Sequence, residues 1–271
     1  MGRLTVRLTL NIVALLAIWS CANKPVQKDL SLNATGPLKQ LQSLGCFSGA
    51  ESTVSINHGF FEICYDPDYR LARYVKHTVK KENLESAGAE RRNRFVADKK
   101  IIEMKLPYVK PDEYRRSGYD KGHLAPAADF AHSQQGMDIS FVMSNMAPQL
   151  KNLNRKAWLK LETQVRQWAC GEEHLTVITG PVLKTGLKKL RSGLVVPEEF
   201  FKVIVDETKP KKAMAFLYSQ KDGAETEYSE RVISFTELEK KISHNFSALF
   251  SSDERIIFTQ TAAPQHWKSC R

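Results

Sequence analysis

The sequence predicts an α+β domain. Segments with strand-like and helix-like patterns are mixed along the chain without strict alternation, which favours layered strands and helices over a Rossmann-type fold. With 271 residues, of which 42% are hydrophobic, the chain is long enough to bury one large core or two small ones. No internal repeat or low-complexity tract interrupts it. We therefore expect one domain after an N-terminal leader.

The first twenty residues have the composition of an export signal. Arg3 and Arg7 give a positive start, and residues 8–19 form an apolar run too short for a comfortable membrane span. We therefore expect the domain to act outside the cytoplasm, in the cell envelope or periplasm or as a secreted protein. Without those two arginines the charge falls from +10 to about +8 (10 minus 2).

The end of this signal allows two kinds of processing. Ile18, Trp19 and Ser20 precede Cys21, an arrangement that resembles a bacterial lipoprotein signal and would leave a lipid anchor on Cys21. An ordinary signal cleaved nearby is the alternative, because Trp19 is bulky for its position. Residues 21–45 are polar without a strong period and are expected to be a tether, and residues 46–271 are expected to be the folded domain.

The remaining cysteines suit an oxidising compartment. Without Cys21 their number is even, and they are Cys46, Cys64, Cys170 and Cys270. Of the three possible pairings we favour Cys46 with Cys64 and Cys170 with Cys270, and four free buried thiols are the alternative. None of their spacings resembles a zinc site.

The first half of the domain shows strands and loops. Residues 52–65 predict a hairpin that turns at Asn57-His58-Gly59, and residues 71–79 predict the next strand. Residues 80–98 are charged and irregular, so we expect a solvated loop or a phosphate clamp. Residues 105–117 carry Pro107 and Pro111 and are expected to be loop.

The second half begins with short elements and then gives a clear helix. Residues 127–138 predict a short helical stretch and residues 141–143 a short strand. Residues 154–169 predict a helix, because apolar residues recur at helical spacing, namely Ala157, Leu161, Val165 and Trp168. Strands are predicted at 175–179, at 200–206 and at 212–218, the last two joined by a turn at Lys209-Pro210, and a capped helix at 234–246.

One histidine lies in a setting that suits catalysis. His123 follows Gly122 and precedes Leu124-Ala125-Pro126, so its loop is expected to be rigid. An imidazole with an ordinary pKa of about 6.5 is able to act as a general base near neutral pH. Taken alone, a structural histidine is the stronger interpretation. His58 is expected in a turn and His77 at the surface.

Asn154 and Glu162 are eight residues apart on the predicted helix. In a regular α-helix they differ by about 80° around the axis and by roughly 12 Å along it. Both would face one broad side, where the amide oxygen of Asn154 would bind an ion whose waters Glu162 holds. Magnesium suits this arrangement, because it keeps several waters and prefers oxygen ligands. Singly, a helix cap and a surface charge are the plainer interpretations of these residues.

Three motifs together resemble one known family. They are Asp120-Lys121-Gly122-His123-Leu124-Ala125-Pro126-Ala127, Ser144-Asn145-Met146-Ala147-Pro148-Gln149, and Asn152-Leu153-Asn154 with Trp158 and Leu161-Glu162. This order closely resembles the DNA/RNA non-specific endonucleases, which include endonuclease G. The resemblance implies a ββα-metal (His-Me finger) nuclease fold, with a central, mainly antiparallel sheet flanked by helices.

The resemblance also implies roles for single residues. His123 would be the general base, Asn154 the direct ligand of Mg²⁺, with Mn²⁺ as a substitute, and Glu162 the partner of the metal's waters. Asn145 would position the site. The family also uses an upstream arginine near the scissile phosphate; Arg91, Arg92 and Arg94 are candidates, and we favour Arg92.

Lys121 departs from the family pattern, which usually has arginine at this position. Lysine keeps the positive charge but loses the bidentate fork, so it would contact phosphate as a point charge. The departure bears on catalytic rate and not on the type of reaction.

The implied function is hydrolysis of DNA and RNA to 5′-phosphate products with little reading of bases. The positive charge is consistent with polyanionic partners. Family members often dimerise, so the resemblance allows a homodimer, but no surface pattern in the sequence decides between monomer and dimer. The alternative is a non-catalytic envelope lipoprotein that binds nucleic acid. The presence of His123, Asn154 and Glu162 argues against that alternative, and no segment after Cys21 is amphipathic enough to suggest an anchor on a lipid surface.

Overall fold

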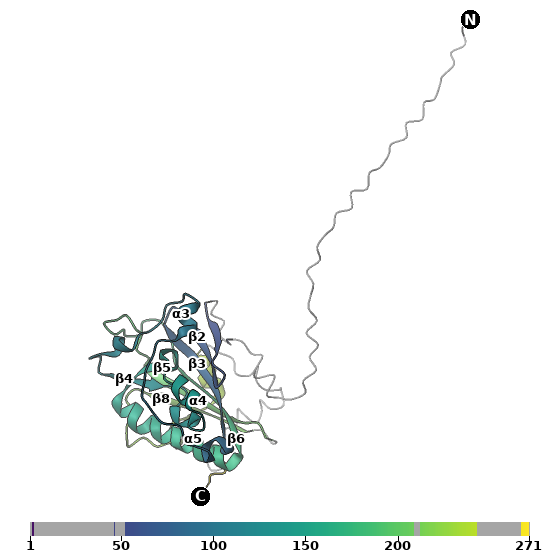
Figure 1. Cartoon of the computed structure of the whole chain (residues 1–271), viewed down its shortest axis with the longest axis vertical. Helices are drawn as coiled ribbons and strands as arrows, with labels where there is room; N and C mark the ends of the chain where they lie inside the picture. Colours follow the sequence, from purple (N-terminus) through teal and green to yellow (C-terminus); the bar gives the residue numbers. More distant parts are fainter. Residues whose placement is uncertain (1, 3–45, 47–51, 209–211, 243–266, 271) are drawn as a thin grey trace. The chain divides into compact units, whose positions relative to one another are not determined.

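The computed structural model describes residues 2, 46, 52–208, 212–242 and 267–270 (Figure 1). The export signal at 1–20 and the tether at 21–45 therefore lie outside the described residues, except for Gly2. The predicted turn at Lys209-Pro210 and the end of the helix predicted at 234–246 lie outside them as well. Among the described residues, no helix has the length and apolar character needed to cross a membrane.

A seven-stranded sheet forms the centre of the described domain, in the order β1-β2-β3-β6-β7-β8-β9. Every neighbouring pair in it is antiparallel. Its strands are β1 (Val54–Asn57), β2 (Phe61–Asp66), β3 (Leu71–Lys80), β6 (His174–Pro181), β7 (Glu199–Asp206), β8 (Lys212–Ser219) and β9 (Val232–Ile233). The strands predicted from the sequence in these regions are confirmed.

Helices cover both faces of this sheet. Alternate residues of β7 point to opposite faces, so Phe200 and Ile204 pack into one core while Phe201 packs into the other. The first core holds α5 (Trp158–Glu172), which Figure 1 shows lying along the sheet, and the second holds α6 (Phe235–Ile242). Lys202 lies between Phe200 and Ile204 in the strand, so its side chain is on the α5 face.

A second, two-stranded sheet leads into α5. It pairs β4 (Tyr119–His123) with β5 (Met146–Leu150), and η4 (Leu153–Ala157), a π-helical turn, then joins β5 to α5. Gly122 lies opposite Ala147, where a Cβ atom would be 2.0 Å from Oε1 of the buried Gln149. A larger residue would force the buried side chain of Gln149 to move, so glycine allows this close approach immediately before His123.

Several short elements differ from the prediction. Two helices, α2 (Lys81–Glu85) and α3 (Lys99–Glu103), and a 3-10 turn, η1 (Pro111–Tyr114), form in or beside stretches expected to be loop. The helical stretch expected at 127–138 consists of two pieces, η2 (Ala127–Phe130) and α4 (Gln134–Ile139).

The strand predicted at 141–143 is wrong. Val142 forms only an isolated bridge with Val96, and the chain then enters η3 (Met143–Asn145). The apolar side chains that suggested a strand are instead buried in the core: Phe141, Val142 and Met143 are each at most 2% exposed.

Both favoured disulfides are confirmed. Cys46 pairs with Cys64 at a Cα separation of 5.1 Å, and Cys170 pairs with Cys270 at 5.5 Å. The second bond ties the end of α5 to a segment 100 residues further along the chain. The helix that carries Glu162 is thus held by a covalent link as well as by packing.

Candidate active site

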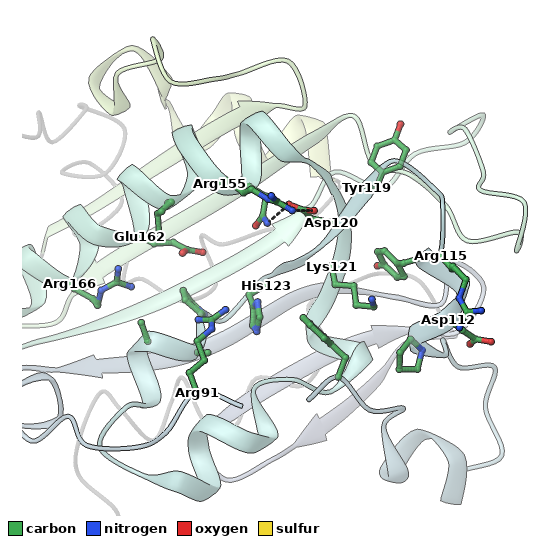
Figure 2. A pocket seen from close by; sticks show the side chains of 18 residues that line it. Arg91, Asp112, Arg115, Tyr119, Asp120, Lys121, His123, Arg155, Glu162 and Arg166 are labelled. Atoms are coloured by element: carbon green, nitrogen blue, oxygen red, sulfur yellow. Dashed lines mark hydrogen bonds and ion pairs between the residues drawn. The ribbon is translucent and has the colours of Figure 1, made fainter. Parts of the chain in front are cut away.

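A cavity of about 820 Å³ lies beside β4 and α5 (Figure 2). Four of the residues predicted for the site line it, namely Lys121, His123, Asn154 and Glu162. Its other charged residues are Arg91, Asp112, Arg115, Asp120, Arg155 and Arg166. Basic side chains therefore outnumber acidic ones around it, which suits an anionic ligand.

His123 ends β4, and the residue is only 9% exposed. The ring packs edge-on against Phe141 with 4.9 Å between centroids, and Phe95 lies 6.0 Å away. Burial, and then the charge of Arg91, lower the pKa of His123 to about 3. The imidazole is therefore neutral at physiological pH. Its Nε2 atom is enclosed and has no hydrogen-bond partner among the described residues.

Asp120 fixes the amide of Asn154. Nδ2 of Asn154 donates to Oδ2 of Asp120 at 3.0 Å, and Arg155 donates to both carboxylate oxygens at 2.7 and 2.8 Å. Burial raises the pKa of Asp120, but the hydrogen bonds from Arg155 and Asn154 outweigh it and hold this pKa below its usual value. Because Nδ2 is engaged, Oδ1 is the atom of Asn154 that remains for a cation.

The π-helical turn changes the angle between Asn154 and Glu162. A π turn takes up one residue more than an α turn. The eight residues from Asn154 to Glu162 therefore rotate around the helix axis about as far as seven residues of a regular α-helix. At roughly 100° per residue the offset around the axis falls from about 80° to about 20°. The two side chains consequently lie nearly in line on the cavity side of the helix.

Glu162 is unusually easy to protonate. Burial raises the pKa of Glu162 to about 7, although the cation of Lys202 counteracts the shift. Lys202 is buried beneath the helix, donates to Oγ1 of Thr179 at 2.7 Å and lies 4.8 Å from the ring of Trp158. Burial lowers the pKa of Lys202 to about 8, with Glu162 acting against that shift. The carboxylate of Glu162 has no hydrogen-bond partner within the described part of the chain, so its oxygens are free to accept from the cavity.

Arg166 also lines the cavity, and it was not assigned from the sequence. Arg166 lies one turn after Glu162 on α5, and Figure 2 shows the two side chains next to each other, with Arg91 and His123 below them. Nη1 of Arg166 donates to Oδ1 of Asp129 at 3.0 Å, and Nη2 donates to Oγ1 of Thr163 at 3.2 Å. The four-residue spacing from Glu162 was the available signal for Arg166.

Arg92, which we favoured from the sequence, does not line this cavity. Its guanidinium contacts Glu90 at 3.2 Å and Asp138 at 3.6 Å and lies at a different pocket. Arg91 lines the cavity instead, 5.3 Å above the ring of Phe141, which also packs against His123. Of the three candidate arginines, Arg91 is therefore the one that lines the cavity, since neighbouring side chains in extended backbone point to opposite sides.

Asn145 also lies outside the cavity lining, fully buried behind His123. Its Oδ1 accepts from the backbone N–H of Ala125 at 2.9 Å, and its Nδ2 donates to the carbonyl oxygens of Ala125 and Ser140 at 2.9 and 2.8 Å. These bonds hold the loop that leaves His123, an arrangement compatible with the positioning role expected for Asn145.

Lys121 points into the cavity between two aromatic rings. Its Nζ atom lies 5.0 Å from the ring centre of Phe95 and 5.5 Å from that of Tyr114. Cation–π attraction to two rings restricts the ammonium group to one end of the cavity. The packing thereby supplies part of the orientation that a lysine lacks relative to arginine.

The oxygen atoms at the site suit a hard cation. Among the described residues, no group of three or more His, Cys, Asp or Glu side chains is arranged to hold a metal ion. An ion at this site would take Oδ1 of Asn154 and keep several waters, with Glu162 accepting hydrogen bonds from them. Magnesium binds in this manner, whereas metals that require several nitrogen or sulfur ligands do not.

Comparison with known proteins places this chain among nucleases. Residues 41–252 match the family model described as DNA/RNA non-specific endonuclease. Human mitochondrial endonuclease G is 35% identical over 158 residues, covering 54% of this chain and 52% of that protein. Mitochondrial nuclease 1 of Schizosaccharomyces pombe is 35% identical over 168 residues, covering 56% and 51%.

The chain spans about half the length of these two relatives. A chain from the crystal structure of the EndoG/EndoGI complex shares the fold, with a TM-score of 0.69 at 24% identity over 82% of this chain and 95% of that one. The residues that match the family model, 41–252, make up more than half of the 271-residue chain. The chain therefore belongs to the DNA/RNA non-specific endonuclease family.

Proposed function

We propose that this protein is a magnesium-dependent endonuclease that hydrolyses phosphodiester bonds of DNA and RNA. The observation that carries the proposal is one cavity that holds a neutral imidazole, an oriented amide oxygen and an ionisable carboxylate, namely those of His123, Asn154 and Glu162. Family membership and relatives named as nucleases support the same reaction.

The cationic side chains bind the backbone phosphate. Arg91 and Arg166 flank His123 and Glu162, and Lys121 extends the positive charge along β4. Such groups recognise phosphate oxygens and carry no information about base sequence. Cleavage of both DNA and RNA with little base preference follows.

His123 acts as the general base. Because Nε2 is enclosed, Nδ1 is the ring nitrogen that a water in the cavity reaches. Nδ1 takes a proton from that water while its oxygen bonds to phosphorus. Arg91 lowers the pKa of His123, so a phosphate paired with Arg91 cancels part of that effect and makes the imidazole a stronger base in the substrate complex.

The bond between phosphorus and the 3′ oxygen then breaks, and the 3′ oxygen takes up a proton from solvent. The products are a 3′-hydroxyl and a 5′-phosphate. Mg²⁺, or Mn²⁺ in its place, supplies positive charge next to the phosphate oxygens when bound. Asn154 would hold the ion through Oδ1, and Glu162 would accept hydrogen bonds from its waters.

The cellular setting is also proposed. We expect an extracytoplasmic protein in the envelope or periplasm or secreted, with a lipid on Cys21 if the leader is of the lipoprotein type. The two disulfides support an oxidising compartment. Cell fractionation of wild type and Cys21→Ser tests the anchor. If wild type carries a lipid on Cys21, the substitution should move the protein from the membrane fraction to the soluble fraction. Sedimentation of the purified protein tests the homodimer.

Incubation with supercoiled plasmid and with single-stranded RNA tests the activity. With Mg²⁺ we expect nicked and then linear DNA, and degraded RNA. The DNA ends should be ligatable until phosphatase removes their 5′-phosphates. A chelator should abolish all of these changes. Binding of nucleic acid without cleavage at any Mg²⁺ or Mn²⁺ concentration would favour the non-catalytic lipoprotein instead.

A further inference from the structure

A buried hydrogen-bonded chain leads from the central sheet to the cavity. It begins at His77 on β3, which was expected at the surface but has a side chain that is 0% exposed. Nε2 of His77 lies 2.9 Å from Oδ2 of Asp129, and Oδ1 of Asp129 accepts from Nη1 of Arg166 at 3.0 Å. Arg166 lines the cavity, whereas His77 does not.

We propose that His77 is a positioning residue for hydrolysis, acting through Asp129 on the guanidinium of Arg166. The inference rests on the proposed nuclease function, in which Arg166 contacts the phosphate. His77 itself touches neither substrate nor metal in this scheme. It holds the carboxylate of Asp129, and that carboxylate holds Arg166.

Burial makes Asp129 dependent on its partners. Burial raises the pKa of Asp129, but the contacts with His77 and then Arg166 outweigh it and keep this pKa below its usual value. Without His77 one oxygen of a buried carboxylate would lose its hydrogen bond, which is costly. Asp129 would then rotate or take up a proton, and Arg166 would lose a charged partner.

Arg166 has few other restraints. Apart from Asp129, its only hydrogen-bond partner among the described residues is Thr163, in the preceding turn of the same helix. An arginine side chain that loses its carboxylate regains rotamer freedom, so it spends less time in the geometry that binds phosphate. This predicts a lower kcat of the folded protein, in addition to any stability that the buried Asp129 loses with its partner.

The other ring nitrogen of His77 makes a sharp test possible. Nδ1 is buried without a hydrogen-bond partner among the described residues, and His77 lines a second cavity of about 290 Å³. Phe60, Phe130 and His132 also line that cavity. The space is large enough to admit free imidazole when the side chain of residue 77 is removed. Imidazole is therefore a chemical probe for the missing ring.

The experiment compares His77→Ala with His132→Ala, a matched histidine of the same cavity that makes no bond to Asp129. We expect kcat on a defined oligonucleotide to fall by roughly tenfold in His77→Ala, with KM changed by less than about twofold and no such change in His132→Ala. His77→Gln, whose amide is able to donate to Asp129, should retain most of the activity. Added imidazole should restore part of the activity of His77→Ala but none of that of Arg166→Ala.

A double variant shows whether the effect passes through Arg166. In the Arg166→Ala background, His77→Ala should have little further effect on kcat. Equal kcat values for His77→Ala and His132→Ala would overturn the inference. It would also be overturned if His77→Ala lowered kcat tenfold both in wild type and in the Arg166→Ala background. Arg166→Ala that cleaves like wild type would also overturn the inference, because the chain would then lead to a residue that hydrolysis does not use. If wild-type protein cleaves no nucleic acid, the proposed function itself fails, so the two failures are distinguishable. Imidazole rescue keeps the test decisive even if His77→Ala is less stable.

Discussion

Asp120 accepts a hydrogen bond from the amide of Asn154 at 3.0 Å, and this bond decides which atom of Asn154 faces a cation. An amide that donates through Nδ2 offers its oxygen in the remaining direction. Arg155 binds the same carboxylate from the outside, with a side chain that is 60% exposed. Asp120 is thus the link between the strand that carries His123 and the helix that carries the proposed metal ligand.

Asp120→Ala should weaken metal use more than it weakens folding. Without the carboxylate the amide of Asn154 is free to turn, and we expect the Mg²⁺ concentration for half-maximal activity to rise by about tenfold or more. Titration of activity with Mg²⁺ measures this. Arg155→Ala is the control, because it removes an exposed partner of Asp120 and leaves the bond to Asn154. Identical Mg²⁺ curves for wild type and Asp120→Ala would contradict this role.

Arg91 and Arg92 give a pair of neighbouring substitutions with opposite expectations. Arg91→Ala should lower kcat/KM by about a hundredfold, because it removes a cation from the cavity. Arg92→Ala should change kcat/KM by less than about twofold, since its ion pairs are exposed. Steady-state kinetics on one oligonucleotide decides between them. A larger effect at Arg92 would return the assignment to the residue favoured from the sequence.

Glu162 should link pH to magnesium. The ionised carboxylate accepts hydrogen bonds from the waters of the ion more strongly than the protonated form does, and burial raises the pKa of Glu162 to about 7. At low Mg²⁺ we therefore expect kcat/KM to fall as pH drops below about 7. Saturating Mg²⁺ favours the ionised form and should move this fall to lower pH by roughly one unit or more. Glu162→Gln should not show this fall in kcat/KM. If kcat/KM of wild type falls at the same pH at every Mg²⁺ concentration, Glu162 is not the group that links pH to magnesium.

His123 should make the protein less stable in acid. Its folded pKa of about 3 lies below the usual value of 6.5, so the unfolded chain binds the extra proton between these limits. The free energy of unfolding contributed by this group is therefore intact above pH 6.5 and decreases as pH falls toward 3. When the pH is lowered from 7.5 to 5, the free energy of unfolding should decrease by roughly 2 kcal/mol less in His123→Asn than in wild type. Urea unfolding at the two pH values measures this difference. Equal losses would show that His123 is protonated in the folded protein.

Local patterns predicted much of this fold and part of the site. The spacing of Leu161, Val165 and Trp168 predicted the helix that became α5, and the motif around His123 indicated the family, which the family match confirms. The extra residue of the π turn leaves no mark in that spacing, because the apolar side chains that define the period begin only at Ala157, the last residue of the turn. The closer alignment of Asn154 with Glu162 was therefore missed.

Long-range packing explains the other differences. Arg91 and Arg92 are adjacent in a charged run without a period, so the sequence does not show which of them lines the cavity. In the structure Arg91 lies over the ring of Phe141, which is 50 residues away. His77 lies between polar neighbours in the sequence and was expected at the surface. Its partner Asp129 is 52 residues away, so no local pattern foretells the pair. Lys202 did leave a signal, since a lysine within an apolar strand needs a buried partner.

Single-turnover cleavage of a labelled duplex by His123→Ala tests the central claim most directly. Wild type and His132→Ala, which keeps the cavity and alters a histidine elsewhere, serve as references at saturating enzyme and Mg²⁺. We predict a rate constant at least about two orders of magnitude lower for His123→Ala, with DNA affinity changed by less than about threefold. A rate constant within about tenfold of wild type would contradict a general-base role for this imidazole and with it the proposed mechanism.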